Sequence, residues 1–100
     1  MKNVLIEAVE AASKVLLDKF ERGIAVEFKG AYDLVTEADR TSEHQIVSVL
    51  RKHCPDHDIL AEEDDYGERR SDHCWIVDPL DGTTNYAHGF PWFAISIALQ

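Results

Sequence analysis

The sequence predicts a chain of the α/β class, because helical and strand patterns share its 100 residues. Apolar residues recur at three- and four-residue spacing over residues 3–21 and again before residue 53, as in amphipathic helices. Short apolar runs or strict alternations at 58–61, 75–77 and 93–100 are typical of strands. A chain of this length holds one domain at most, with a small core.

Residues 3–21 are expected to form the first helix, with Gly23 just beyond it as a suitable stop. The acidic and basic residues fall largely on the face opposite the apolar positions, so the apolar stripe indicates core packing. The apolar positions are Leu5, Val9, Ala12, Leu16 and Phe20.

The segment after this helix predicts extended structure. Residues 24–29 alternate between apolar and other side chains, and Gly30 bounds them, which is typical of a short strand. Residues 33–35 are also expected to be extended.

A second helix is expected to begin at Thr36 and to run to about His53. Thr36 and Asp39 fit a capping box, and the residue before Pro55 disfavours helix. Asp39 thereby has a complete structural explanation as part of the cap. The side chains expected to be buried are Ile46, Val49 and Leu50.

Residues 58–61 predict a short buried strand that delivers Glu62 and Glu63 at its end. Adjacent carboxylates in a strand point to opposite faces, so both are not expected to bind the same ion. Taken alone, the acidic run that starts at Glu62 has the composition of an exposed loop.

The run 75–77 predicts a buried strand that meets Asp78. Pro79 cannot donate to a sheet ladder, so regular pairing is expected to stop there. Asp81 follows, and residues 82–85 predict a turn or a helix start. Two carboxylates and a small-residue turn thus follow the carboxyl end of a strand, where open sheets place ligand sites.

Two further segments complete the chain. Residues 85–91 are expected to form a short helix or turn and then a loop. Residues 93–100 alternate bulky apolar side chains with small ones, which predicts a strand with one bulky and one small face.

The negative charge is concentrated in the second half of the chain. Residues 1–53 hold nine acids and eight bases, whereas residues 54–100 hold ten acids and two bases. This balance disfavours direct nucleic-acid binding through a basic face. The acidic second half of the chain would repel a phosphate and would accept one only after divalent cations had bound. The charge pattern therefore favours a phosphate bridged by metal ions over one bound directly by the protein. The alternative is a solvated acidic surface, especially at Asp64, Asp65, Glu68 and Asp72.

Cys54 and Cys74 are widely separated and form no C-x-x-C motif, which indicates ordinary packing cysteines and a reducing, cytoplasmic setting. Charged residues interrupt the amino-terminal apolar stretch, so neither a signal peptide nor a membrane span is predicted.

Carboxylate and carbonyl oxygens at Asp78, Leu80 and Asp81 suit a hard cation such as Mg²⁺, with Mn²⁺ as an alternative. N–H groups at the following helix start suit a phosphate. Equally consistent with the chemistry is an Asx-turn, in which Asp81 caps the next segment and Asp78 is merely solvated.

The order of residues 75–91 favours the first of these interpretations. The motif D-P-L-D-G-T-T-N, preceded by W-I-V and followed by H-G-F-P, resembles the first signature of the inositol monophosphatase family. The segment D-L-V-T-E-A-D at 33–39 resembles the family's D-L-V-T-x-x-D, and E-E at 62–63 resembles its G-E-E, with Ala61 in place of the glycine. The likeness runs from about residue 3 to residue 100.

This resemblance implies a layered α+β sandwich of the kind shared with fructose-bisphosphatases, with residues 1–100 as the amino-terminal portion of one such domain. It implies a Mg²⁺-dependent phosphomonoesterase that uses a metal-activated water and no side-chain nucleophile. By residue, it implies metal binding by Glu62, Asp78, Asp81 and the carbonyl of Leu80.

The resemblance also assigns the remaining roles. Glu62 and Thr83 would orient the water, Asp39 would be an outer acid near the metals, and Glu63 would support the site. Substrate contacts fall to Asp81, Gly82, Thr83 and Thr84, and the protein is expected to be a homodimer.

Several functions stay open within and beyond this resemblance. Thr84 favours inositol monophosphate or a similar small polyol phosphate, because relatives acting on 3′-phosphoadenosine 5′-phosphate often have lysine there. A fructose-bisphosphate phosphatase of the same superfamily is another option. A non-catalytic protein-binding relative, or an inactive fragment, is an alternative of another class. These 100 residues alone are expected to be inactive and prone to associate, because a W-D-x-A-A-type segment of the family is not among them.

Overall fold

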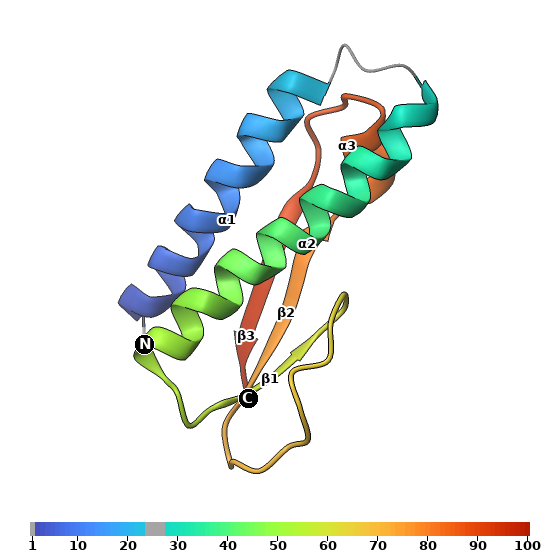
Figure 1. The fold of residues 1–100 in the computed structure, drawn as a ribbon. Coiled ribbons are helices and arrows are strands. Elements are labelled where there is room, and N and C mark those ends of the chain that lie inside the picture. Colours follow the sequence, from blue (N-terminus) through green and yellow to red (C-terminus); the bar gives the residue numbers. More distant parts are fainter. Residues whose placement is uncertain (1, 24–27) are drawn as a thin grey trace.

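The computed structural model describes residues 2–23 and 28–100, with side chains described outside 22–36. Two long helices, α1 (Lys2–Gly23) and α2 (Phe28–His53), lie side by side and run in opposite directions over one face of a sheet (Figure 1). The sheet contains β1 (Asp58–Ala61), β2 (Cys74–Asp81) and β3 (Ala94–Leu99), and the short helix α3 (Thr83–Ala87) precedes β3. The predicted α/β class is confirmed.

The strands are arranged in the order β1-β2-β3, with β1 parallel and β3 antiparallel to the central β2. Alternate residues of β2 therefore face the helices, and Trp75 and Val77 on that face are buried. Ile76 lies on the opposite face and is exposed. The predicted strands at 58–61 and 93–100 are confirmed, as is the first helix. The strand at 58–61 is not buried as predicted, because it lies at the edge of the sheet and only Ile59 in it is buried.

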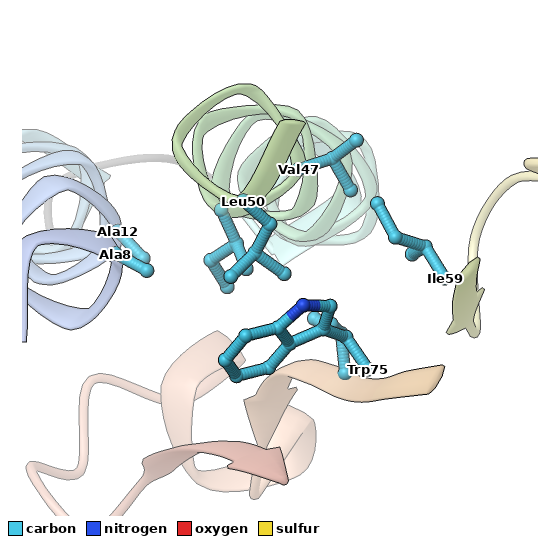
Figure 2. Packing of buried hydrophobic residues seen from close by; sticks show 8 residues of the cluster. Ala8, Ala12, Val47, Leu50, Ile59 and Trp75 are labelled. Carbon is cyan, nitrogen blue, oxygen red and sulfur yellow. The ribbon is translucent and has the colours of Figure 1, made fainter. Parts of the chain in front are cut away.

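The main core lies between α1, α2 and the sheet (Figure 2). The small residues Ala8 and Ala12 on α1 let it approach α2 closely, and Leu50 of α2 points toward Trp75. The indole Nε1 of Trp75 donates to Nδ1 of His57 at 3.1 Å, so this fully buried ring leaves no polar atom without a partner. A second cluster, formed by Leu16, Ala38, Leu80 and Tyr86, joins α3 to both long helices.

The predicted beginning of the second helix is wrong. Helix α2 begins at Phe28, so Phe28 and Lys29 are helical rather than part of a strand, and residues 33–35 are helical rather than extended. The rest of the predicted strand, residues 24–27, lies outside the described residues. Thr36 is inside α2 and therefore not its N-cap. A cap is worth about 1 kcal/mol, whereas each further helical residue adds a hydrogen bond, and no proline interrupts residues 28–36.

Regular pairing stops at Pro79 as predicted, because the register is irregular between Asp78 and Asp81, but the strand itself continues to Asp81. Asp78 pairs with Ser96 and Asp81 with Ala94, so β2 spans three steps where β3 spans two. One extra residue on β2 forms a bulge. The bulge accommodates Pro79, which has no N–H to donate to the ladder, and it changes the direction of the residues that follow.

No helix among the described residues is long and apolar enough to cross a membrane. Cys54 and Cys74 are both free, and Cys74 is buried, in keeping with a packing role.

Candidate active site

The carboxyl ends of the parallel strands β1 and β2 lie at the same edge of the sheet, and acidic residues follow or end both strands. Ala61 pairs with Val77 at the end of β1. Glu62 directly follows Ala61, Asp78 directly follows Val77, and the charge of Asp78 acts on Glu62, so the predicted acids of two motifs meet at one edge. Asp81 ends β2 three residues later.

Helix α2 adds a fourth acid to this edge. Asp39 is only 8% exposed, and burial raises the pKa of its carboxyl to about 7, with the negative charges of Glu63, Asp78, Glu62 and Glu43 adding to the effect. The predicted outer acid therefore lies within the electrostatic reach of both strand ends.

Glu62 is affected by the same set of charges. Partial burial raises the pKa of its carboxyl, and the charges of Asp78, Glu63, Glu43 and Asp81 raise it further. The residue as a whole is exposed, so an ion from solvent can reach it. The structure thus brings together Asp39, Glu62, Glu63, Asp78 and Asp81.

The turn after β2 is shaped by Asp78 and Gly82. Oδ1 of Asp78 accepts the N–H of Leu80 at 3.3 Å, so it is Asp78 that makes the Asx-type contact. Gly82 is the N-cap of α3 in the left-handed conformation, and no side chain caps that helix. The reading in which Asp81 caps α3 is therefore not what the structure shows.

The predicted substrate residues follow directly. Thr83 and Thr84 form the first turn of α3 and are exposed, whereas the side chain of Leu80 is buried in the second core cluster. Gly82 has a structural reason as well as the predicted one, since an added Cβ would meet the carbonyl oxygen of Trp92 at 3.0 Å.

Sequence reasoning missed two buried polar residues of α2, Ser42 and Glu43, which are both fully buried. Ser42 donates its hydroxyl to the carbonyl of Pro79 at 2.9 Å. Glu43 accepts the backbone N–H groups of Glu63 and Asp64. A signal was present, because Glu43 lies four residues after Asp39 and three before Ile46, on the apolar stripe of the helix, where an acid needs partners.

The donor set of this edge suits a hard divalent cation, since it consists of carboxylate and carbonyl oxygens. A cation would also neutralise the negative charges of the carboxylates. Among residues 2–23 and 28–100, however, no three His, Cys, Asp or Glu side chains are already arranged as a coordination shell. A cavity of about 370 Å³ is lined by residues 59–67, including Glu62 and Glu63, but not by Asp39, Asp78 or Asp81. The fit is therefore one of donor chemistry and charge.

Comparisons with known proteins agree on one family. The sequence model of the inositol monophosphatase family matches residues 1–100. The chain is 45% identical over 105 residues to a protein of Pseudomonas aeruginosa named Nus factor SuhB, covering all of this chain and 39% of that protein. It is 45% identical over 98 residues to an inositol-1-monophosphatase of Synechocystis, covering 96% of this chain and 34% of that protein.

A solved structure shows the same fold. The extragenic suppressor protein SuhB of Bartonella henselae superposes with a TM-score of 0.81 at 38% identity, covering 99% of this chain and 38% of that one. This chain thus spans little more than a third of the length of these relatives.

Proposed function

The chain belongs to the inositol monophosphatase family, and from this premise we propose that the protein carrying it is a Mg²⁺-dependent phosphomonoesterase. The observation that supports the proposal most directly is the meeting of acids from β1, β2 and α2 at one edge of the sheet, where burial and the charges of the neighbouring acids raise the pKa of Asp39 and of Glu62. Buried or crowded carboxylates of this kind are expensive for a fold to keep, and they occur where a cation or a proton is handled.

The residues that would hold the ions are Asp78, Asp81, Glu62 and the carbonyl of Leu80. A bound divalent cation supplies Lewis acidity and lowers the pKa of bound water, so that hydrolysis can run near neutral pH. The exposed position of Glu62 and the partly buried position of Asp78 leave their carboxylates open to solvent on one side.

The chain's own residues would orient the reacting groups. Glu62 and the hydroxyl of Thr83 would align the water, and Glu63 would support Glu62. Asp39, which lies within the electrostatic reach of both strand ends, would be an outer acid beside the ions. The phosphate and its alcohol would contact Asp81, Gly82, Thr83 and Thr84, which follow one another along the turn into α3.

For the substrate we propose inositol monophosphate or a similar small polyol phosphate, since Thr84 is short and uncharged at the position where nucleotide-directed relatives often have lysine. A phosphate-release panel on the protein carrying this chain tests both claims. We expect Mg²⁺-dependent turnover of inositol 1-phosphate, abolished by chelation. Preference for 3′-phosphoadenosine 5′-phosphate or for fructose 1,6-bisphosphate would show that the subgroup is wrong.

A second candidate function is protein binding without a need for catalysis, because a 45% identical relative is named a Nus factor. The strongly acidic second half of the chain argues against direct RNA contact but allows contact with a protein. Absence of phosphate release from every ester, together with retained ion binding, would favour this candidate. A homodimer is part of the main proposal, and its test is the molecular mass in solution.

A further inference from the structure

We propose that Ser42 and Glu43 of α2 are positioning residues that hold the acidic ends of β1 and β2 in one fixed arrangement. We refer to this pair as the Ser42–Glu43 clamp. The inference rests on the proposed function and deepens it, because it explains how like-charged ligands are kept together before an ion arrives.

Glu43 is the half of the clamp that holds the end of β1. Its side chain is fully buried, and all three of its hydrogen bonds go to the segment after β1. Oε1 accepts the N–H of Glu63 at 2.9 Å, and Oε2 accepts the N–H of Asp64 at 3.0 Å and the hydroxyl of Tyr66 at 3.0 Å. A buried carboxylate is retained only when several donors satisfy it, and here those donors belong to the loop that carries Glu62.

Ser42 is the half that holds the end of β2. Its hydroxyl donates to the carbonyl of Pro79 at 2.9 Å, inside the bulge between Asp78 and Asp81. Pro79 has no N–H through which the sheet could fix this peptide, so the contact from α2 restrains a point that the strand ladder leaves loose.

The two anchor points are next to the two principal acids. Glu63 directly follows Glu62, and Pro79 directly follows Asp78. Because Ser42 and Glu43 are neighbours on one rigid helix, the two bonds fix the separation of these chain segments. The charges of Asp78 and Glu63 both raise the pKa of Glu62, so the acids repel one another and would move apart if the restraint were removed.

The test compares the clamp variants with controls of the same chemistry. Glu43→Gln keeps the shape of the side chain but turns one acceptor oxygen into an NH₂ group that faces a donor. Ser42→Ala removes the hydroxyl that donates to the carbonyl oxygen of Pro79. Glu10→Gln at an exposed position of α1 and Ser48→Ala at an exposed position of α2 make the same changes and serve as matched controls.

The first measurement is amide hydrogen exchange in metal-free protein. We expect the amides of Glu63 and Asp64 to exchange at least about 10-fold faster in Glu43→Gln than in the wild type. The second is Mn²⁺ affinity by calorimetry, which we expect the clamp variants to weaken by about 10- to 100-fold, the usual effect of losing a group that orients a metal ligand. The controls should stay within about twofold in both measurements.

A third variant separates positioning from general loosening. Ile46→Val removes a buried methyl group from the same helix and leaves the hydrogen-bonding groups of Ser42 and Glu43 in place, so it should lower stability and leave Mn²⁺ affinity unchanged. If Ile46→Val weakens Mn²⁺ binding as much as Glu43→Gln, the clamp has no specific role. If Glu43→Gln does not fold, Tyr66→Phe, which removes one of its three donors, is expected to weaken binding by about threefold.

The outcomes separate this inference from the function on which it rests. If the wild type binds Mn²⁺ and folded clamp variants bind it equally well, the clamp is overturned and the proposed function stands. If the wild type binds no Mn²⁺ at all, the proposed function fails and the clamp's role in it fails with it.

Discussion

Gly82 lies directly against the backbone of Trp92, whose carbonyl oxygen would be 3.0 Å from any Cβ added at position 82. Gly82 also adopts φ +88°, a conformation that L side chains rarely take. Two separate constraints therefore require glycine at the turn between Asp81 and α3.

We predict that Gly82→Ala lowers the free energy of unfolding by clearly more than Gly67→Ala does. Gly67 has φ +101° with nothing within 4 Å of an added Cβ, so alanine there meets only the backbone cost of about 1–2 kcal/mol. The difference between the two variants isolates the contact with Trp92. Urea unfolding of both measures it, and equal losses would mean that the loop after Phe90 moves aside without cost.

Tyr86 joins α3 to α1, since its hydroxyl donates to the carbonyl of Leu16 at 2.8 Å in a buried setting. Burial raises the pKa of this hydroxyl to about 12, so it remains a donor through neutral pH. We predict that Tyr86→Phe costs about 1 kcal/mol of unfolding free energy. Trp92→Phe, at a side chain that is 72% exposed, is the aromatic control and should change little.

These elements show what the sequence could and could not predict. The alternation of residues 93–100 was sufficient to predict a strand, because a period of two does not fit a helix. The short run at 75–77 predicted another strand through its β-branched and aromatic residues. The capping pattern at Thr36 led to a wrong helix start, because one N-cap contributes less free energy than the additional helical turns before it. Glu43 was missed because its donors lie about 20 positions away, on a loop whose path depends on the sheet.

The same distinction applies to the candidate site. The motifs identified Asp78, Asp81 and Glu62, and parallel pairing of β1 with β2 explains why they meet. Pro79 indicated the break in regular pairing, but nothing in the motifs indicated that β2 resumes its pairing with β3 at Asp81.

Asp39 predicts a pH dependence of stability in metal-free protein. Its carboxyl has an ordinary pKa of 3.8, and burial with the neighbouring charges raises the pKa to about 7 in the folded state. The folded protein thus keeps a proton that the unfolded chain releases. This contribution is complete below about pH 4 and is lost as the pH rises through about 7.

Asp39→Asn should therefore abolish the decrease in unfolding free energy that Asp39 causes as the pH rises. We expect the variant to gain on the wild type between about pH 4 and pH 8, by up to about 4 kcal/mol of unfolding free energy. Urea titrations in chelator at both pH values measure the gain, with Asp72→Asn at an exposed residue as the control. A difference between variant and wild type that does not change with pH would refute the expectation.

The sheet face opposite the helices has an apolar row across all three strands. Leu60 pairs with Ile76 and Ile76 with Ala98, and Leu60 and Ile76 are 62% and 40% exposed. Exposed apolar rows on short sheets favour association. We predict that Leu60→Lys lowers the associated fraction of the 100-residue chain in sedimentation velocity. The control Gln45→Lys, at an exposed position of α2, should leave that fraction unchanged. If both variants associate equally, the surface through which the chain associates is not this apolar row.

The last prediction concerns the charge of Asp81. Asp81→Asn keeps the size of the side chain but removes one negative charge from the edge where Glu62 lies within its electrostatic reach. We expect the variant to bind Mn²⁺ at least about 10-fold more weakly in calorimetry, because an amide oxygen is a poorer ligand for a hard cation than a carboxylate. Asp72→Asn, at an exposed residue of the connector before β2, removes the same unit of net charge and serves as the control. If both variants weaken binding equally, the ion responds only to the overall negative charge, and if Asp81→Asn keeps both the affinity and the stoichiometry of the wild type, Asp81 is not a ligand.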